Sequence, residues 1–330
     1  MKKKILALLL IAAFTLTACE KVEKTDTSNS TNVSKEEATE ATTEKIEVTE
    51  KSLAEMREAY EVSVDDLKAE DYPEDSTMHK ILTDKKLIVA TNATYPPYEY
   101  RLMVEGKSEF GGIDMEMARL LAKKMGVELE IVDTSFDSLI AGLDSGMYDL
   151  LLAGMNKDPE REKQVDFTSD YYFPTLVLLV READLDKYKT EEDIPEDFKF
   201  GNQMGTVQEN VTNAHFPNAK DNSLYLKNYT DLTAALETGQ IDGLLVEDII
   251  AKAFMAQNSK LAISEGINYP GETGFAGALK KGDKDFQDYL NAFIKEIQDN
   301  GTFDKIVVNS NELAGVAEES PEETSTEATE

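Results

Sequence analysis

Three segments of the chain carry groups suited to holding small charged partners. Arg161 has a planar guanidinium whose N–H donors match the two oxygens of a carboxylate. Gly205 and Thr206 precede a helix expected to begin at Val207, and the free N–H groups and positive dipole end of a helix start also favour an anion. Glu247, at the end of an expected strand, is suited to a cation. Together these residues indicate a site that binds opposite charges.

Two of these assignments have plainer alternatives. Arg161 has Asp158 and Glu160 as neighbours, and an arginine between such acids is often only part of a surface ion pair. Asp248 competes with Glu247, and either acid can serve simply as a helix N-cap. Open α/β sheets bind ligands at the carboxyl ends of their strands, and this register favours Glu247.

The sequence offers little for catalysis or metal binding. Its two histidines, His79 and His215, stand beside no serine or acid in a recognisable motif, although a triad assembled in space stays open. No His, Cys and Glu cluster has metal-ligand spacing, and no glycine-rich phosphate loop occurs. We therefore expect no catalytic residue, no cofactor and no metal.

Composition limits the class of protein and its partners. With 330 residues, of which 41% are hydrophobic, the chain can form one large or two medium domains with a real core. A net charge of −31 disfavours binding to nucleic acid, or to anionic lipid by charge. The single cysteine excludes an internal disulfide, so the fold depends on its hydrophobic core. We expect a monomer with no nucleic-acid partner.

The N-terminus resembles the export signal of a bacterial lipoprotein. Lysines at residues 2–4 precede an apolar run, residues 5–16, that is too short to span a membrane as a stable helix. Cys19 follows small residues as in a lipobox, where the thiol is acylated and the chain is cut before it. The alternative is an ordinary signal peptide with an incidental cysteine. We expect residues 1–18 to be removed and Cys19 to anchor the protein by lipid on the extracytoplasmic side of the cell membrane.

Acidic stretches flank the expected globular part. Residues 20–50 contain no aromatic residue and bury too little apolar surface to order a chain, so we expect residues 19–77 to form a largely disordered stalk. Within it, residues 52–68 show a helical pattern, and whether this segment packs on the globular part stays open. The tail, residues 313–330, is expected to be a second solvated acidic spacer.

From about Met78 onward, expected strands and helices alternate. Strands are expected at 87–91, 127–132, 150–153, 198–203, 224–226, 242–245 and 261–263. Helices are expected at 114–125, 136–145, from 207, at 231–238 and at 248–257. This order predicts two α/β units with parallel strands. The apolar run 176–180 is expected to join the two units, with a crevice between two lobes.

Six segments in order resemble motifs of the family 3 extracellular solute-binding proteins, the amino-acid receptors of ABC importers. They lie between Met78 and about Ser310, at residues 91–99, 112–117, 154–161, 165–168, 205–209, and 280–282 with 299–306. The resemblance implies an α/β, two-lobed periplasmic-binding-protein-like fold (type 2), whose ligand cleft lies between lobes joined by two hinge strands. Lobe I would comprise residues 78–173 and 276–312, and lobe II residues 174–275, with crossings near 171–175 and 273–277.

The resemblance also implies how an amino acid would be held. Arg161 on lobe I and the helix start at Thr206 and Val207 on lobe II would share the carboxylate, so that the ligand stabilises the closed form. Glu247 would hold the ammonium. The family often has aspartate at that position, so the longer glutamate is a departure.

Four further positions complete the implied site. The carbonyl of Gly154 and the side chain of Asn156 would add contacts to the ammonium and the carboxylate. Serine or threonine is usual in place of Asn156, which puts the local geometry in question. Tyr95 and Phe136 match positions whose rings sandwich the ligand, although a lone aromatic residue is more often part of a core.

Selectivity for the ligand side chain is expected to depend on Asn92 and Gln203. Both are uncharged, so a charged ligand side chain would lack a partner at a cost of several kcal/mol. We therefore expect a neutral polar L-amino acid such as glutamine or asparagine. A basic amino acid stays possible if Glu99 or Asp133 turns inward.

The sequence as a whole predicts a substrate-binding lipoprotein of an ABC transporter. It would capture a free L-amino acid by lobe closure and deliver it to a membrane permease. The alternatives are an amino-acid sensing module, a cyclohexadienyl-dehydratase-like enzyme on the same fold, or a structural surface lipoprotein. A sensor would need a signalling domain in the same chain, and a dehydratase would need an acid or base facing the ligand side chain.

Overall fold

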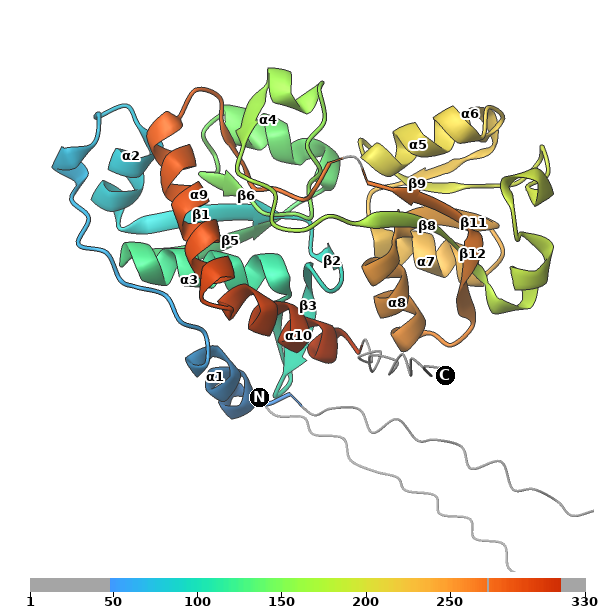
Figure 1. Ribbon diagram of the computed structural model, residues 1–330, viewed down its shortest axis with the longest axis horizontal. Coiled ribbons are helices and arrows are strands. Elements are labelled where there is room, and N and C mark those ends of the chain that lie inside the picture. Colours follow the sequence, from blue (N-terminus) through green and yellow to red (C-terminus); the bar gives the residue numbers. More distant parts are fainter. Residues whose placement is uncertain (1–47, 272, 316–330) are drawn as a thin grey trace, which may run out of the picture. The chain divides into compact units, whose positions relative to one another are not determined.

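The computed structural model describes residues 48–271 and 273–315, which belong to one compact unit, residues 46–330. The expected signal peptide, the lipidated Cys19, the stalk up to residue 47 and the tail from residue 316 lie outside the described residues. Two α/β lobes make up the described part (Figure 1). No helix within it has the length and apolar character needed to cross a bilayer.

The first lobe, lobe I, is built on a five-stranded sheet. Its strand order is β5 (Glu128–Asp133), β1 (Lys86–Thr91), β6 (Leu150–Leu151), β13 (Ala278–Lys280) and β7 (Val165–Phe167). The first three strands are parallel, as the βαβαβ pattern predicts, whereas β13 runs antiparallel to both of its neighbours. The helices of this lobe are α2 (Thr77–Asp84), α3 (Ile113–Met125), α4 (Leu139–Asp144), α9 (Lys284–Asp299) and α10 (Thr302–Ala314).

A small antiparallel sheet of β2 (Thr94–Tyr95), β3 (Glu99–Val104) and β4 (Lys107–Gly111) completes lobe I. A tight turn with a cis peptide bond between Pro96 and Pro97 connects β2 to β3. The register of this pair sets Tyr95 opposite Glu99. Both side chains are thereby brought to one place, although four residues separate them in sequence.

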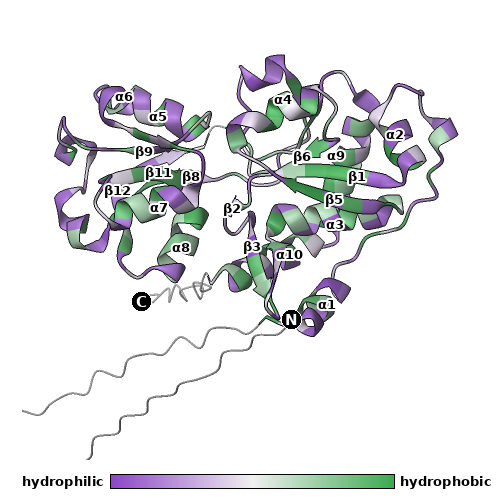
Figure 2. Ribbon diagram, turned by 180° about the vertical axis from the view of Figure 1, so that it is seen from behind, coloured by the Kyte–Doolittle hydropathy of each residue, from purple (hydrophilic) through white to green (hydrophobic). Residues whose placement is uncertain are grey.

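The second lobe, lobe II, contains a mixed sheet. Its antiparallel part has the order β11 (Gly243–Glu247), β8 (Thr175–Arg181) and β12 (Leu261–Pro270). A parallel pair, β9 (Gly201–Gln203) and β10 (Leu224–Leu226), is linked to β11 by a bridge between Phe200 and Gly243. The helices are α5 (Val207–His215), α6 (Ala219–Asn222), α7 (Tyr229–Glu237) and α8 (Asp248–Gln257). Figure 2 shows hydrophobic strands β8 and β11 inside this lobe and hydrophilic outer faces on its helices.

We expected from the sequence that the apolar run 176–180 joins the two units, and this expectation is wrong. The run forms most of β8, the central strand of the antiparallel sheet, and residues 176–180 are buried. Such a strand lacks polar alternation because both of its faces are covered, and its sequence alone does not distinguish it from a buried connector.

Two neighbouring chain segments connect the lobes. The segment before β8 and the segment after β12 lie side by side, since the N–H of Phe275 donates to the carbonyl of Tyr172 (2.7 Å) and the N–H of Tyr171 donates to the carbonyl of Phe275 (2.9 Å). This pair corresponds to the two hinge strands expected from the sequence. Through this contact the two segments form one narrow connection between the lobes.

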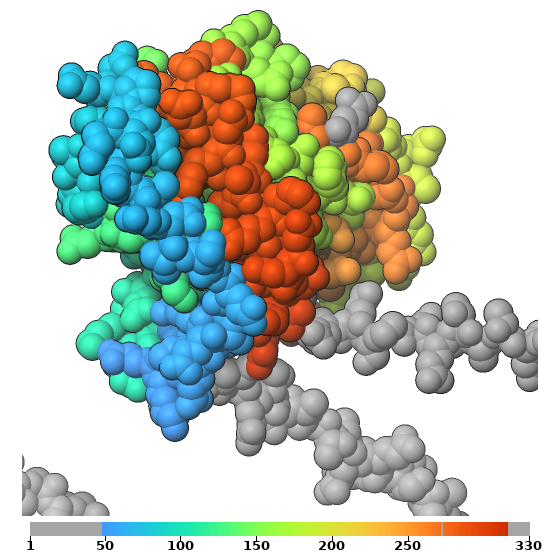
Figure 3. Space-filling model, turned by 60° about the vertical axis from the view of Figure 1, so that its left-hand side comes forward, coloured from blue at the N-terminus to red at the C-terminus, as the bar shows by residue number. Residues whose placement is uncertain are grey.

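The helical pattern of residues 52–68 is only half realised. Helix α1 (Glu50–Glu58) begins at a capping box on Thr49 and ends at Glu58, and the chain then continues without helix to a short 3₁₀ turn (Ala69–Asp71). Residues 48–72, here called the strap, lie on lobe I and cross α9 and α10 (Figure 3). The described part of the chain thus packs on lobe I from about thirty residues before the Met78 boundary inferred from the sequence.

Charged and polar contacts fasten the strap to lobe I. Arg57 donates to both carboxylate oxygens of Glu116 on α3 (2.9–3.2 Å). Lys124 of α3 forms ion pairs with Asp65 of the strap (3.1 Å) and with Glu296 of α9 (2.8 Å). Tyr60 is buried in the core of the lobe. The open question about this segment is thereby answered, because it packs on the globular part.

The ion pair of Arg57 and Glu116 gives a test of the strap. We expect Arg57→Ala to lower the free energy of unfolding by about 1–3 kcal/mol, because the buried Glu116 carboxylate is left with Arg119 as its remaining ion-pair partner. Urea unfolding measures the change. The control is Lys51→Ala, which removes an exposed pair with Glu55 on the same helix and should cost less than about 0.5 kcal/mol. Equal effects of the two variants would contradict a docked strap.

Candidate ligand-binding site

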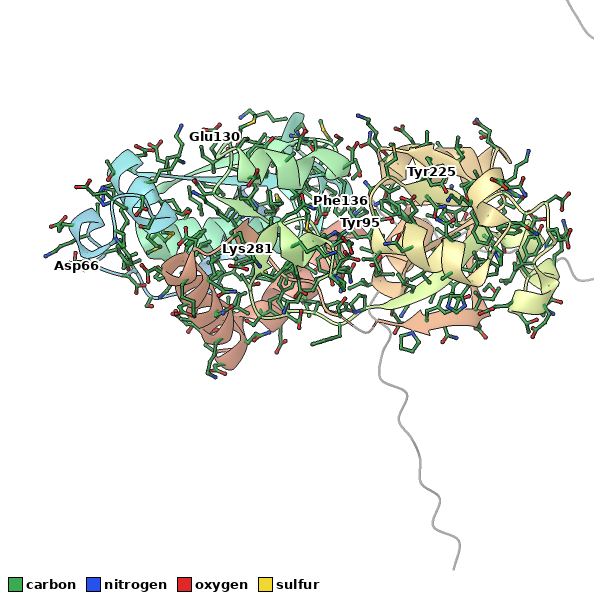
Figure 4. All side chains as sticks on the ribbon, turned by 90° about the horizontal axis from the view of Figure 1, so that it is seen from above. Asp66, Tyr95, Glu130, Phe136, Tyr225 and Lys281 are labelled. Atoms are coloured by element: carbon green, nitrogen blue, oxygen red, sulfur yellow. The ribbon has the colours of Figure 1, made fainter. Side chains whose placement is uncertain are left out.

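Residues from both lobes surround one small cavity, whose volume is about 10 Å³. Lobe I contributes Asn92, Tyr95, Glu99, Phe136, Ala153, Gly154, Asn156 and Arg161, and lobe II contributes Gln203, Thr206, Gln208 and Tyr229. Figure 4 shows Tyr95 and Phe136 close together where the two lobes face each other. Eight of the ten positions singled out from the sequence therefore line a common space.

The other two expected positions, Val207 and Glu247, line an adjoining cavity on the side of the connecting segments. Glu247 still belongs to the same cluster of side chains, because it accepts hydrogen bonds from Tyr95 and Gln208, which both line the first cavity. Val207 begins α5 directly after Thr206 and lines the adjoining cavity together with Asn156 and Gln208.

Arg161 is a buried cation that is satisfied by backbone carbonyls. Its guanidinium donates to the carbonyl of Asn156 in lobe I (2.7 Å) and to that of Gly205 in lobe II (2.9 Å). Among the described residues, no carboxylate lies within ion-pair distance of it. Burial lowers the pKa of Arg161 to about 10, with Asp158 opposing the decrease, so the group is charged at neutral pH. A buried charge of this kind is suited to an anionic ligand.

The start of α5 stands beside this guanidinium. Thr206 is the N-cap, and its hydroxyl accepts from the N–H of Glu209 (3.3 Å) and donates to the carbonyl of Gln203 (2.9 Å). Gly205 has a φ of +78°, a conformation that favours glycine and turns its carbonyl toward Arg161. The remaining N–H groups of the first turn add a second anion-binding element from lobe II.

Glu247 is a buried acid at the end of β11. Its ionised form carries a charge opposite to that of Arg161. Its carboxylate accepts from the hydroxyl of Tyr95 and from the side-chain amide of Gln208 (2.7 Å). Burial raises the pKa of Glu247 to about 8, its own backbone amide works against the rise, and the nearby Asp248 adds to it. A cation beside this group would stabilise its charged form.

Asn92 and Gln203 meet across the lobes, as expected from the sequence. The amide of Gln203 donates to Asn92 Oδ1 (2.8 Å) and to the carbonyl of Lys227 (2.8 Å). Asn92 in turn donates to the carbonyl of Thr134 (2.9 Å) and to Asn228 Oδ1 (3.3 Å). This corner of the cavity is polar and uncharged.

The aromatic rings take different partners. Tyr95 packs against Tyr229 with 4.6 Å between ring centroids, and the ring of Phe136 lies 5.3 Å from the guanidinium carbon of Arg161. Neither residue is only core, since both also line the cavity. The side-chain amide of Asn156, which also lines the cavity, donates to the carbonyl of Thr273 in the second connecting segment (3.3 Å).

Glu99 is the residue whose position the sequence left most uncertain. It lines the cavity, it is 1% exposed, and its Oε2 is buried with no hydrogen-bond partner in the described part of the chain. Burial, together with the nearby Asp114 and Asp133, raises the pKa of Glu99 well above its ordinary value. Asp133, the other acid considered, instead pairs with Arg101 on a partly exposed surface (2.8 Å).

Three lining residues, Ala153, Gln208 and Tyr229, were not singled out as site residues from the sequence. Ala153 follows β6, and the other two each stand in the first turn of a helix that follows a strand end, so strand-end register was the signal that could have found them. The described residues contain no group of three or more His, Cys, Asp or Glu placed to hold a metal. With one buried cation and two buried acids, the arrangement can hold a small molecule that carries both charges.

Comparisons with known proteins agree with this geometry. A model of the bacterial extracellular solute-binding proteins, family 3, matches residues 87–309. The arginine-binding extracellular protein ArtP of Bacillus subtilis (strain 168) is 35% identical over 230 residues, which are 67% of this chain and 84% of that protein.

Solved structures show the same fold. A substrate-binding protein of an amino acid ABC transporter from Streptococcus pneumoniae, bound to L-arginine, has a TM-score of 0.69 and 30% identity and covers 74% of this chain and 100% of its own. The ancestral amino-acid-binding protein AncCDT-1, a precursor of cyclohexadienyl dehydratase, has a TM-score of 0.64 and 28% identity over 71% of this chain and 99% of its own. The two-lobed fold expected from the sequence is confirmed.

Glu247 should make the stability of the protein without ligand depend on pH. Its pKa is 4.5 in the ordinary case and about 8 in the folded protein, so the folded state binds this proton more tightly. The stabilisation from the group is therefore complete below the unfolded pKa and is lost as pH rises through the folded one.

We expect Glu247→Gln, which stays neutral, to gain stability relative to the wild type as pH rises from about 5 to 8. Urea unfolding at several pH values measures this difference, with Glu160→Gln, a change of an exposed acid near the cavity mouth, as the control. Parallel stability curves for Glu247→Gln and the wild type would contradict the raised pKa.

Proposed function

The chain belongs to the bacterial extracellular solute-binding proteins of family 3, and we propose that it captures a free L-amino acid between its lobes for delivery to the membrane permease of an ABC transporter. The observation that carries this proposal is the buried guanidinium of Arg161, which touches one backbone carbonyl in each lobe. An α-carboxylate placed there would meet Arg161 on lobe I and the start of α5 on lobe II.

Lobe closure follows from that shared contact. A ligand that contacts both lobes binds the closed arrangement more tightly than the open one, and so shifts the population toward it. The two connecting segments near Tyr172 and Phe275 supply a short hinge. A permease that docks only the closed arrangement would thereby respond to ligand.

The α-ammonium is assigned to Glu247. Its carboxylate is already held by Tyr95 and Gln208, so it is oriented before the ligand arrives. Asn156 and Gln208 line both the cavity beside Arg161 and the adjoining cavity beside Glu247. Removing either charge would leave the opposite end of the zwitterion without a partner.

For the ligand side chain, Glu99 favours a cation, with L-arginine as the first candidate. Its carboxyl is buried in the cavity wall with one oxygen unpartnered, which a guanidinium would satisfy. Two of the similar proteins are described as arginine-binding or arginine-bound. The sequence left a basic amino acid open on the condition that Glu99 turns inward. Glu99 lines the cavity, so this condition is met.

A neutral polar ligand is the second candidate. The Asn92 and Gln203 amides face each other across the lobes, and a glutamine or asparagine side chain would exchange donors and acceptors with them. A dehydratase is the third, because Glu99 provides the buried acid that such chemistry needs and AncCDT-1 is a precursor of one.

Anchoring at Cys19 and placement on the extracytoplasmic side of the cell membrane remain part of the proposal. The family description, extracellular, supports export. A lipid anchor at the start of an acidic segment would keep a monomeric receptor near its permease.

A thermal-shift screen of the twenty amino acids tests the capture of a zwitterion. We expect L-arginine to raise Tm most, because a ligand at about a thousand times its Kd adds about 4 kcal/mol to the folded state. The variant Arg161→Met removes the guanidinium and keeps a long side chain. For this variant we expect calorimetric titration to show affinity at least about a hundredfold weaker for every ligand that the wild type binds. If no amino acid shifts the wild type, or if the variant binds normally, the assignment fails.

Glu99→Gln tests the side-chain assignment. We expect it to weaken arginine binding by about thirtyfold or more and to change glutamine binding by less than about threefold, because the missing charge faces only the cationic side chain. Calorimetric titration with both ligands gives the ratio. The matched control is Glu160→Gln, which removes an equal charge from the exposed rim. Equal weakening for both ligands would reject Glu99 as the selective group. Turnover of a cyclohexadienyl substrate by the wild type would instead favour the dehydratase.

A further inference from the structure

Asp114 is a buried carboxyl that neither the sequence nor the cavity lining assigns to the site. It stands in the first turn of α3, and its exposed fraction is 0%. Buried acids are rare unless their oxygens are held, so its partners indicate what it does.

The start of α3 fixes the position of Asp114. Gly112, the N-cap residue, has a φ of +117°, and a Cβ there would lie 2.1 Å from the carbonyl oxygen of Tyr98, so only glycine fits. That close approach lets the N–H of Ile113 donate to Pro97 (2.9 Å) and the N–H of Asp114 donate to Tyr98 (3.0 Å). The helix start is thereby fastened to the turn between β2 and β3.

One oxygen of Asp114 connects two functional parts of the molecule. Asp114 Oδ2 accepts from the N–H of Gly154 (2.8 Å) and from the hydroxyl of Tyr171 (3.0 Å). Gly154 follows β6 and lines the cavity, with a φ of +50° and the ring of Tyr95 only 3.1 Å from where a Cβ would stand. Tyr171 lies in the first connecting segment, and its N–H donates to Phe275 in the second.

We propose that Asp114 is a positioning residue, which holds the Gly154 backbone in the conformation that the amino acid's α-ammonium requires and ties that backbone to the hinge. The inference rests on the proposed function. Asp114 itself does not touch the ligand, since it lies behind Gly154. It acts on any amino acid alike, because the α-ammonium is common to all of them.

If Asp114 positions the binding site, its charge state gives ligand affinity a pH dependence, which a residue that only fills the core would not do. Burial raises its pKa to about 7, and the Gly154 N–H and the Tyr171 hydroxyl oppose the rise. The titratable groups that face it are Glu99 and Tyr98 on the β2–β3 side and Tyr171 in the connecting segment. Since both of its donors favour the carboxylate, affinity should fall as pH decreases through about 7.

The test compares Asp114→Asn with Glu116→Gln. Glu116 is a buried carboxyl on the same helix, but it pairs with Arg57 and Arg119 and has no hydrogen bond to the cavity wall. We expect Asp114→Asn to weaken arginine and glutamine binding by an equal factor of about ten, and to lose the part of the pH dependence centred near 7. Glu116→Gln should lower Tm and leave both affinities within about twofold.

Tyr171→Phe is the second variant, in case Asp114→Asn does not fold. It removes one of the two donors to Asp114 and should weaken both ligands by about two- to fivefold. The inference is overturned if Asp114→Asn keeps the affinity and pH profile of the wild type, or if Tyr171→Phe alters Tm alone. Failure of the wild type to bind any amino acid would instead overturn the proposed function, so the two failures are distinguishable.

Discussion

One buried guanidinium organises the cleft. Arg161 is buried without a carboxylate partner among the described residues, and it is held by one carbonyl from each lobe. These two backbone carbonyls accept hydrogen bonds from the guanidinium but do not neutralise its charge, so an anion that reaches it gains a strong, charge-assisted contact. One of those carbonyls belongs to lobe II. The binding of an anion at Arg161 is therefore linked to whether the two lobes are in contact.

Three acidic side chains near the cleft are buried, and their burial has a common effect. Burial raises the pKa of Glu99, Asp114 and Glu247, so each acid becomes fully charged at neutral pH only if a donor or a cation favours the carboxylate. A ligand with two positive groups and one negative group would match Arg161, Glu247 and Glu99 together. Binding of such a ligand would also release protons, which couples capture to the pH outside the cell.

The strap adds an element outside the segment that matches the family model, which begins at residue 87. It is held to α3 by two ion pairs and to α9 and α10 by hydrogen bonds. Helix α10 also reaches lobe II, where the side chain of Gln257 donates to the carbonyl of Ala314 (3.4 Å). A rigid first lobe leaves the hinge as the place where motion between lobes is absorbed.

The sequence by itself determined the family, the alternating elements and most of the cavity lining, because these depend on local patterns and strand-end register. Its errors have a physical cause. Residues 176–180 read as a connector because a strand buried on both faces has no alternation. Residues 59–68 read as helix because their apolar residues have helical spacing, but in the non-helical strap Tyr60 is buried while Val64 is exposed. Only the tertiary structure decided that Glu99 turns inward while Asp133 pairs with Arg101, and that Asp114 joins Gly154 to Tyr171. Such choices are made by contacts between residues distant in sequence, which no local pattern encodes.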